Sequence, residues 1–500
     1  MSQGQLKAHP GIARVSPTRA MDETGTRVAS LAEAPAVPAT RLSTTDSFFV
    51  AYQERSRILM TLCGEVDLAG PLERQHLEQM ILHIVRRWPR LGQRLKKTVF
   101  GLKWAGPCRP EEMLRVADDS DASGGLTAWR NEPIDPFCDP PFQVLWIPPR
   151  AAGPREGGVA HGDSHTIAFR AHHSVMDGES LVAVTADAVP FVAQISIGKH
   201  VPTPAAAPAA TLKDLVSVKQ LIRRRRLGEM FRYTRWLAAE ARAARSARIA
   251  CESFAIGDTQ LCERRLDGDA LERLKQRAKA TRTGASWLSA AAWMRAIHTW
   301  NTSAGAKTKT IPNPIISLEF PVSLRRGLGG ECANDGHDLL GNFISPLVVF
   351  GDATEPLEQL ARKLRKQVMQ GIRSQSQLGT PLFSAPAKFL PWSMFRRVAV
   401  SPQTTGFATS HFTWFEQADA CANVARVSDG ALRVTGQRIV TPVCLHMGAA
   451  LVLLVSSDYA QIFITYRETA FSPAAPDQLM DLMVAELESD RRNNETQEPR

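Results

Sequence analysis

Seven consecutive residues bring ionisable side chains together, His172-His173-Ser174-Val175-Met176-Asp177-Gly178. A histidine near neutral pH is partly unprotonated, so its imidazole can remove a proton from a hydroxyl or an amine. Acyl transfer needs this step. No Gly-x-Ser-x-Gly sequence surrounds Ser174, and no cysteine lies beside the motif. Direct attack by an acceptor on an acyl donor, with a histidine as the base, is therefore the simplest chemistry.

The elements that must position these side chains are a strand and a helix. Residues Thr166–Ala171 place apolar side chains at every second position, which predicts a strand. Residues Glu179–Ala193 are apolar and nearly free of helix breakers, which predicts a helix that Pro190 bends or ends. Successive side chains at the end of a strand point in opposite directions, so only one of the two histidines faces a given cleft.

Two other interpretations of the histidine pair stay open. Paired histidines often have a purely structural role, and His-His followed by Asp also contains the residue types that bind metals. The complete seven-residue string directly after a predicted strand is more specific than any of its residues alone. It favours a catalytic site over both alternatives, with no metal.

The string resembles the His-His-x-x-x-Asp-Gly signature of a large acyltransferase superfamily. This superfamily includes chloramphenicol acetyltransferase, condensation domains of nonribosomal peptide synthetases, plant acyltransferases and bacterial wax ester synthase/diacylglycerol acyltransferases. The last branch is the most similar, because Leu42-Ser43-x-x-Asp46-x-x-Phe49 matches its opening segment. The resemblance implies an α/β fold of two chloramphenicol acetyltransferase-like subdomains. Mixed sheets with flanking helices would enclose an active-site tunnel at the subdomain interface.

The resemblance also implies roles for individual residues. His173 would be the general base, and His172 would face away from the cleft and support the loop. Asp177 would be structural, held by an arginine, and Arg325 of Pro-Val-Ser-Leu-Arg is the candidate partner because its fork fits a carboxylate. Gly178 would let the backbone turn close to the donor.

Two later segments are expected to complete the site. Gly341-Asn342 resembles the segment that lines the acyl tunnel, where Gly341 permits a close approach and Asn342 hydrogen-bonds the donor or the backbone. Ser410 occupies the place where relatives carry a Ser-Asn-x-Gly-like strand, and its hydroxyl would assist the oxyanion. The chain departs from the family at Ser410-His411-Phe412, and it has Ser286-Trp287 where wax ester synthases often carry Asn-Asp.

Length and composition predict more than one structural unit. The chain has 500 residues, 44% of them hydrophobic, enough for a sizeable core. We predict a disordered leader over 1–40, an N-terminal subdomain over 41–198, a Pro- and Ala-rich linker over 199–211, a C-terminal subdomain over 212–490 and a tail over 491–500. Residues 438–443, 449–456 and 461–466 are expected to form a closing sheet in the second subdomain.

The charge of the chain predicts anionic partners. The formal net charge is +10, which suits a phosphorylated donor, an acidic carrier protein or an anionic membrane surface. Residues 212–250 are predicted to form a basic helix that either docks on a membrane or, the preferred interpretation, packs on the core with its charges in water. The basic residues match no nucleic-acid-binding motif.

The remaining composition argues against several classes of site. The eight cysteines have neither zinc-site nor disulfide spacing. No apolar run approaches the ~20 residues that span a bilayer. We therefore expect a cytoplasmic protein, with peripheral contact at the inner membrane surface as an alternative, and no cofactor beyond acyl-CoA as co-substrate.

The function implied by the resemblance is an acyl-CoA-dependent O-acyltransferase. It would move an acyl group from a thioester to the hydroxyl of a small-molecule or lipid-like acceptor, with His173 as the base. Two alternatives come from other classes. A free-standing condensation-type enzyme would take its donor from an acyl carrier protein and form an amide. A non-catalytic member would keep the fold without turnover.

Overall fold

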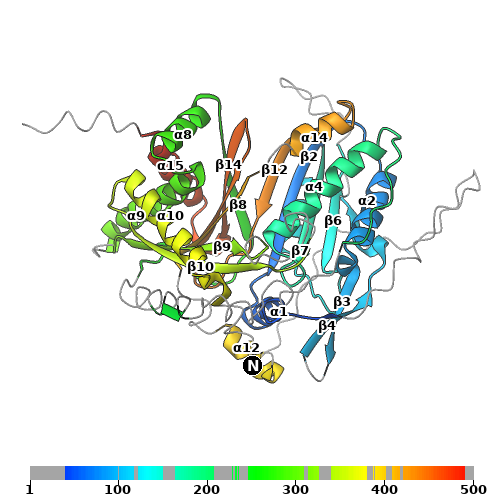
Figure 1. The fold of residues 1–500 in the computed structure, drawn as a ribbon, viewed down its shortest axis with the longest axis horizontal. Helices are drawn as coiled ribbons and strands as arrows, with labels where there is room; N and C mark the ends of the chain where they lie inside the picture. Colours follow the sequence, from blue (N-terminus) through cyan, green and yellow to red (C-terminus); the bar gives the residue numbers. More distant parts are fainter. Residues whose placement is uncertain are drawn as a thin grey trace, which may run out of the picture.

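The computed structural model describes residues 40–98, 101–117, 122–149, 164–207, 246–308, 313–325, 339–379, 389–400, 408–416 and 420–489, with a few isolated residues between 228 and 387. These residues form two halves that lie side by side, each a sheet with helices against it (Figure 1). The predicted α/β class with two sheet-and-helix subdomains is therefore confirmed. The leader up to residue 39 and the tail lie outside the described residues.

The first half contains a five-stranded mixed sheet with the strand order β12-β2-β7-β6-β5. Its strands are β2 (Thr61–Ala69), β5 (Leu114–Val116), β6 (Phe142–Ile147), β7 (Ser164–His172) and β12 (Arg433–Val440). Its helices are α2 (Arg74–Arg87), α3 (Ala122–Asn131), α4 (Gly178–Ile195) and α14 (Ala420–Val427). Phe169 of β7 packs in the core beneath α2 and α4, whereas Ala168 packs with Trp129 of α3 on the opposite face. The predicted alternation of this strand is confirmed.

The second half contains a six-stranded mixed sheet with the order β10-β9-β11-β13-β14-β8. Its strands are β8 (Thr259–Asp267), β9 (Ile315–Ser323), β10 (Ile344–Asp352), β11 (Ser410–Glu416), β13 (Ala449–Val455) and β14 (Tyr459–Arg467). Its helices are α8 (Gly268–Ala280), α9 (Ala285–Thr308), α10 (Leu357–Arg373) and α15 (Ala475–Glu488), which gather on the outer side (Figure 1). The inner face of this sheet meets the first half, where Val452 and Leu454 pack with Ile439 of β12 and Val182 of α4.

Strand β12 joins the sheet of the first half although it follows most of the second half in the chain. It pairs antiparallel with β2 from Arg433 opposite Ala69 to Val440 opposite Cys63. The predicted grouping of 438–443 with the two following strands in one closing sheet is wrong, because only β13 and β14 belong to the second sheet. Alternation reports which side chains are buried, but it does not report which sheet edge a strand completes. The division of domains at 199–211 stays a prediction.

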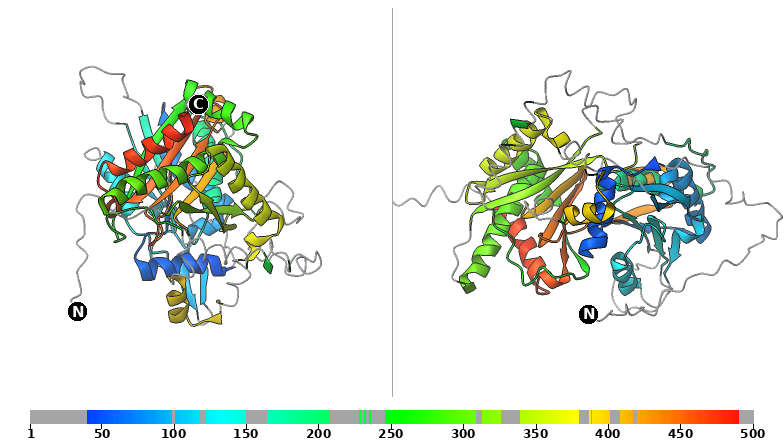
Figure 2. Two further views of the ribbon diagram at one scale, coloured as in Figure 1. Left: turned by 90° about the vertical axis from the view of Figure 1, so that its left-hand side faces the viewer. Right: turned by 90° about the horizontal axis from the view of Figure 1, so that it is seen from below.

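Two helices from distant parts of the chain lie together where the halves meet. Helix α1 (Thr44–Ser56) begins at Ser43, whose hydroxyl accepts the Asp46 N–H while the Asp46 side chain accepts the Ser43 N–H. This reciprocal capping box fixes the start of the helix. Helix α12 (Trp392–Ala399) packs against α1 (Figure 2). A small sheet, β1-β4-β3, lies beside them, with bounds β1 (Thr40–Arg41), β3 (Gln93–Thr98) and β4 (Gly101–Pro107).

Two helix predictions differ from the structure. Helix α4 continues through Pro190 to Ile195 instead of ending near Ala193. The predicted basic helix 212–250 lies mostly outside the described residues, and its last part, 246–250, is not helical. There the backbone joins the second half instead, because the Ala247 N–H donates to the carbonyl of Ile315.

Among the described residues, four short 3-10 turns join these elements, η2 (Pro89–Gly92), η3 (Pro110–Glu112), η4 (Ser376–Leu378) and η6 (Glu468–Ala470). Among the helices that the structure describes, none is long and apolar enough to cross a bilayer. The same described ranges contain no group of three or more His, Cys, Asp or Glu side chains able to hold a metal ion.

Candidate active site

The seven-residue motif forms the loop between β7 and α4, at the centre of the molecule. His172 is the last residue of β7, and Asp177 is the N-cap of α4. The backbone N–H of His173 donates to the carbonyl of Met60, just before β2. The loop is therefore attached to the first sheet at one end and to a helix start at the other.

The imidazole of His173 is held by one amide and one aromatic ring. Its Nδ1 lies 3.0 Å from Oδ1 of Asn342, and the ring of Phe49 stacks on it at 3.8 Å with an interplanar angle of 8°. Asn342 Nδ2 donates to the carbonyl of His173 at 2.6 Å and to Asp46 Oδ1 at 2.8 Å. Both of these partners accept, so the orientation of the amide is fixed and its Oδ1 faces the imidazole. His173 then carries its proton on Nδ1, which leaves Nε2 unprotonated.

The electrostatic surroundings keep His173 neutral. Burial lowers the pKa of its imidazole and outweighs the hydrogen bonds and the Asp177 charge, which favour the protonated form. His411 on β11 lowers the pKa further. A base must be unprotonated to accept a proton, and a histidine whose pKa lies below its ordinary value is in this form throughout the neutral range.

His172 points to the opposite side and is fully buried. Its Nδ1 lies 2.7 Å from the Ser174 hydroxyl, and the Ser174 N–H also approaches this nitrogen, at 3.1 Å. Burial, with a smaller effect from His173, lowers the pKa of His172 to about 3. Its contacts fit the predicted supporting position inside the loop.

Asp177 and Arg325 form a bidentate ion pair, as the sequence predicted for these two positions. Arg325 Nη2 donates to Asp177 Oδ1 at 2.9 Å, and Nη1 donates to Oδ2 at 3.0 Å. The remaining lone pairs of the carboxylate accept the backbone N–H groups of Ser180 and Phe343, each at 2.8 Å. Desolvation favours the neutral acid, but the Arg325 charge and these hydrogen bonds outweigh it and lower the pKa of Asp177. The carboxylate is thus a buried anion with every acceptor position filled.

Arg325 extends this clamp to four further groups, of which the carbonyl of Leu339 accepts from Nε at 3.2 Å. Its guanidinium donates to Glu179 Oε2 at 3.0 Å, to the Ser180 hydroxyl at 2.6 Å and to the carbonyl of Gly341 at 3.2 Å. The Asp177 and Glu179 charges outweigh desolvation and raise the pKa of Arg325. The clamp therefore ties the start of α4 to the Gly341-Asn342 segment of the second half.

Both glycines at the site meet close neighbours. Gly341 has φ +152°, and a Cβ there would lie 3.0 Å from the Phe343 ring and 3.3 Å from Arg90. A Cβ on Gly178 would lie 3.1 Å from Cζ of Phe415, a β11 residue of the second half. The space above Gly178, expected for the donor, is therefore bordered by Phe415.

Two predicted substrate-binding residues have protein partners in the structure. The side-chain amide of Asn342 hydrogen-bonds His173 and Asp46, as described above. The Ser410 hydroxyl donates to the carbonyl of Ala449 at 2.7 Å and accepts the indole N–H of Trp293 at 3.0 Å. A hydroxyl has a single proton, so the one expected for the oxyanion is used inside the second half.

Four residues of the site had no assigned role in the sequence interpretation. Asp46 and Phe49 belong to the quoted Leu-Ser-x-x-Asp-x-x-Phe segment, and their three-residue spacing puts both on one face of α1. That spacing was the available signal. His411 and Glu319 pair at 3.7 Å between Nδ1 and Oε1 on β11 and β9. No local sequence pattern marks Glu319 and His411, because their two strands are adjacent only in the folded sheet.

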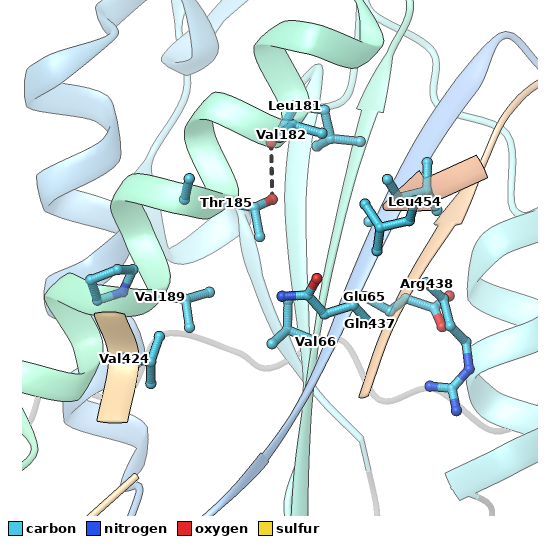
Figure 3. A pocket seen from close by; sticks show the side chains of 14 residues that line it. Glu65, Val66, Leu181, Val182, Thr185, Val189, Val424, Gln437, Arg438 and Leu454 are labelled. Atoms are coloured by element: carbon cyan, nitrogen blue, oxygen red, sulfur yellow. Dashed lines mark hydrogen bonds between the residues drawn. The ribbon is translucent and has the colours of Figure 1, made fainter. Parts of the chain in front are cut away.

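A hollow lies between α4 and strands β2 and β12, as Figure 3 shows. The space in it that a water-sized molecule can occupy is about 40 Å³, and its mouth is open to solvent. Mostly apolar side chains line it, among them Leu181, Val189 and Leu454. The Thr185 hydroxyl donates to the Leu181 carbonyl at 2.9 Å and so adds no free donor to the wall. Phe415, which lies next to Gly178, packs on the apolar cluster that contains Leu454, a residue of the hollow's wall.

Solved structures of condensation domains and of an acetyltransferase have the same two-part fold. The first condensation domain of the calcium-dependent antibiotic synthetase, in complex with a substrate analogue, is 14% identical with a TM-score of 0.64 and covers 90% of this chain and 96% of its own. Trichothecene 15-O-acetyltransferase from Fusarium sporotrichioides is 13% identical with a TM-score of 0.62, over 90% and 95%. The starter condensation domain of rhizomide synthetase, in complex with C8-CoA and Leu-SNAC, is 12% identical with a TM-score of 0.59, over 90% and 94%.

These likenesses establish the fold of the chain. No protein-family model and no curated protein matches it. The condensation-domain and acetyltransferase architecture agrees with the superfamily resemblance, whereas the assignment to the wax ester synthase branch stays a prediction. The tunnel expected between the halves stays a prediction as well.

Proposed function

We propose that the protein is an acyltransferase in which His173 is the general base. The observation that carries the proposal is the arrangement of Asn342 and Phe49 around the imidazole, which places the proton on Nδ1 and leaves Nε2 to accept one. The burial that lowers the pKa of His173 keeps this nitrogen unprotonated at neutral pH. The fold shared with condensation domains and an O-acetyltransferase supports the reaction class.

The reaction balances without a covalent enzyme intermediate. Nε2 of His173 removes the proton of the acceptor hydroxyl while its oxygen attacks the thioester carbonyl carbon. The tetrahedral intermediate collapses, the carbon–sulfur bond breaks, and the imidazolium returns the proton to the leaving thiolate. The products are an ester and a free thiol, and His173 is neutral again.

The other motif residues position this base. Asp177 and Arg325 hold the loop against the second half, and His172 supports the loop through its contact with the Ser174 hydroxyl. Asn342 is proposed as a positioning residue in place of the substrate-binding role predicted from the sequence. It fixes the tautomer of His173, in the way that a hydrogen bond to one ring nitrogen sets the role of the other.

The proposed donor is a thioester, with acyl-CoA as the first candidate. The net charge of +10 suits the phosphates of CoA. A peripheral contact with an anionic membrane stays a separate prediction, since the basic segment that would make it lies mostly outside the described residues.

A condensation-type reaction is the second candidate, because several structures that share the fold are condensation domains. One of them is in complex with both C8-CoA and Leu-SNAC. In this alternative the donor is bound to a carrier protein, and an amine acceptor gives an amide. The same base would serve both reactions.

Mass spectrometry of the purified protein tests the proposal directly. The protein is incubated with a panel of acyl-CoA donors, or with the same acyl groups on a carrier protein, and with alcohols and amines. We expect an ester or amide that wild type and His200→Ala form and His173→Ala does not. His200 is the control because it is an exposed histidine outside the site. Equal product from wild type and His173→Ala would contradict the assignment of the base.

A further inference from the structure

On the inner face of the second sheet, the ionisable side chains of Glu319 and His411 lie next to one another. They are register partners on the neighbouring strands β9 and β11. Their register partners on the two flanking strands are apolar, with Val348 opposite Glu319 on β10 and Ala450 opposite His411 on β13. Side chains alternate along a strand, so residues adjacent in sequence to the pair face the outer helices instead.

Strand β11 runs along the catalytic loop. Its Phe415 reaches Gly178 at one end of the loop, and four residues earlier His411 is close enough to lower the pKa of His173 at the other. Val348, the register partner of Glu319, packs on the same apolar cluster as Cys444. Beside Cys444, the Leu445 N–H donates to the Tyr52 hydroxyl of α1 at 2.7 Å, so Glu319 lies on the side of the second sheet that faces α1. Burial, with a smaller effect from the Glu319 charge, raises the pKa of the Cys444 thiol to about 12.

Glu319 and His411 are accessible and only loosely paired. The Glu319 side chain is 30% exposed and that of His411 is 20% exposed, whereas Ser410 and Phe412 beside them are fully buried. Their separation of 3.7 Å exceeds hydrogen-bond distance. Among the described residues, His411 is the one ion-pair partner of the Glu319 carboxylate. The Glu319 carboxylate can therefore accept a hydrogen bond from a further, positively charged donor.

We propose that Glu319 and His411 form the acceptor subsite and select an acceptor with an ammonium group near its nucleophilic hydroxyl. The inference rests on the proposed function and names its acceptor class, an amino alcohol instead of the lipid-like alcohol that the sequence allowed. Glu319 binds the ammonium group, since a carboxylate attracts a cation and repels the phosphates of a CoA donor. His411 contributes a hydrogen bond on the same side, and the hydroxyl is left facing His173.

Matched acceptors test the subsite by turnover. Wild type, Glu319→Gln and the control Glu416→Gln, at the exposed end of β11, are assayed with 3-amino-1-propanol, 1,3-propanediol and 1-butanol. We expect wild type and the control to prefer the amino alcohol. Glu319→Gln should raise its KM by about 10- to 100-fold, the value of a hydrogen bond to a charged group. The KM values of both uncharged alcohols and all kcat values should stay nearly constant. Equal KM increases for all three alcohols, or a wild type that prefers 1-butanol, would overturn the subsite.

Calorimetric binding separates this inference from the proposed function. The same proteins are titrated with 3-amino-1-propanol and with 1,3-propanediol in the absence of any donor. Binding of the amine to wild type and not to Glu319→Gln supports the subsite even if no acyl transfer occurs, which would refute the proposed function alone. Turnover without a preference for the amine, and without differential binding, refutes the subsite alone.

Discussion

The two ends of the catalytic loop are held in opposite ways. At Asp177 a buried ion pair and two backbone donors fill every acceptor position of the carboxylate. At His173 one neutral amide and one stacked ring hold the imidazole. The difference shows a division of labour. The Asp177 end gains rigidity from charge. At the other end, a counter-charge in contact with His173 would raise the pKa of the imidazole and keep it protonated.

The largest expected effect is at the His173 end. His173→Ala should lower kcat by about 10²- to 10⁴-fold, because a general base contributes that much to a proton transfer. The free energy of unfolding should fall by about 1–3 kcal/mol, because the substitution removes a stacked ring and leaves Oδ1 of Asn342 without its partner. Activity is followed by release of free thiol and stability by chemical denaturation. If the substitution unfolds the protein, His173→Gln, which preserves more of the side-chain volume, replaces it.

The Asp177 end should behave in the opposite way, with stability as the main loss. Asp177→Ala should cost about 3–5 kcal/mol of unfolding free energy, because it leaves the buried Arg325 with only the partly exposed Glu179 as its counter-charge. A double-mutant cycle with Arg325→Ala should show coupling between the two positions. The control is the exposed pair Arg264–Asp481, whose removal should cost about 1 kcal/mol or less. Additive single effects at Asp177 and Arg325 would contradict the clamp.

Asn342 should affect rate and pH profile together. Asn342→Ala should lower kcat/KM by about 10- to 100-fold, as expected for one or two lost hydrogen bonds around the base. The Asn342 hydrogen bond favours protonated His173, so its loss should move the acid limb of the profile to lower pH. Asn301→Ala, which removes a buried amide far from the loop, should reduce stability without moving the limb. An unchanged limb in Asn342→Ala would leave Asn342 a purely structural residue.

The smallest expected effect is on the pH dependence of the free energy of unfolding, to which His172 and Asp177 contribute at different pH. The pKa of His172 is about 3 in the folded state, so the unfolded chain binds a proton below the ordinary value of 6.5 while the folded protein does not. The free energy of unfolding therefore falls as the pH drops from 6.5 toward 3, and His172→Gln should reduce this slope. The lowered pKa of Asp177 acts further down, since its stabilisation is lost only below its ordinary value of 3.8. Denaturation curves between pH 7 and pH 2, with His200→Gln as the control, check this separation.

The sequence was informative where the structure depends on local pattern. The strand, the loop and the helix around His173 follow from alternation and from the absence of breakers. The pairing of Asp177 with Arg325 came from the family resemblance. The partners of Ser410 could not be predicted, because Trp293 and Ala449 reach it from other elements of the second half. The roles of Glu319 and His411 were equally hidden, because they arise from the order of strands in a sheet.

The return of β12 to the first sheet bears on how the molecule is made. During synthesis the first half emerges with one edge of β2 bare, and its partner follows only after more than 360 further residues. A bare edge is a template for pairing with another chain. The first half thus reaches its final form only after most of the second has left the ribosome. Chaperone dependence and the failure of truncated chains are expected consequences of this one exchanged strand.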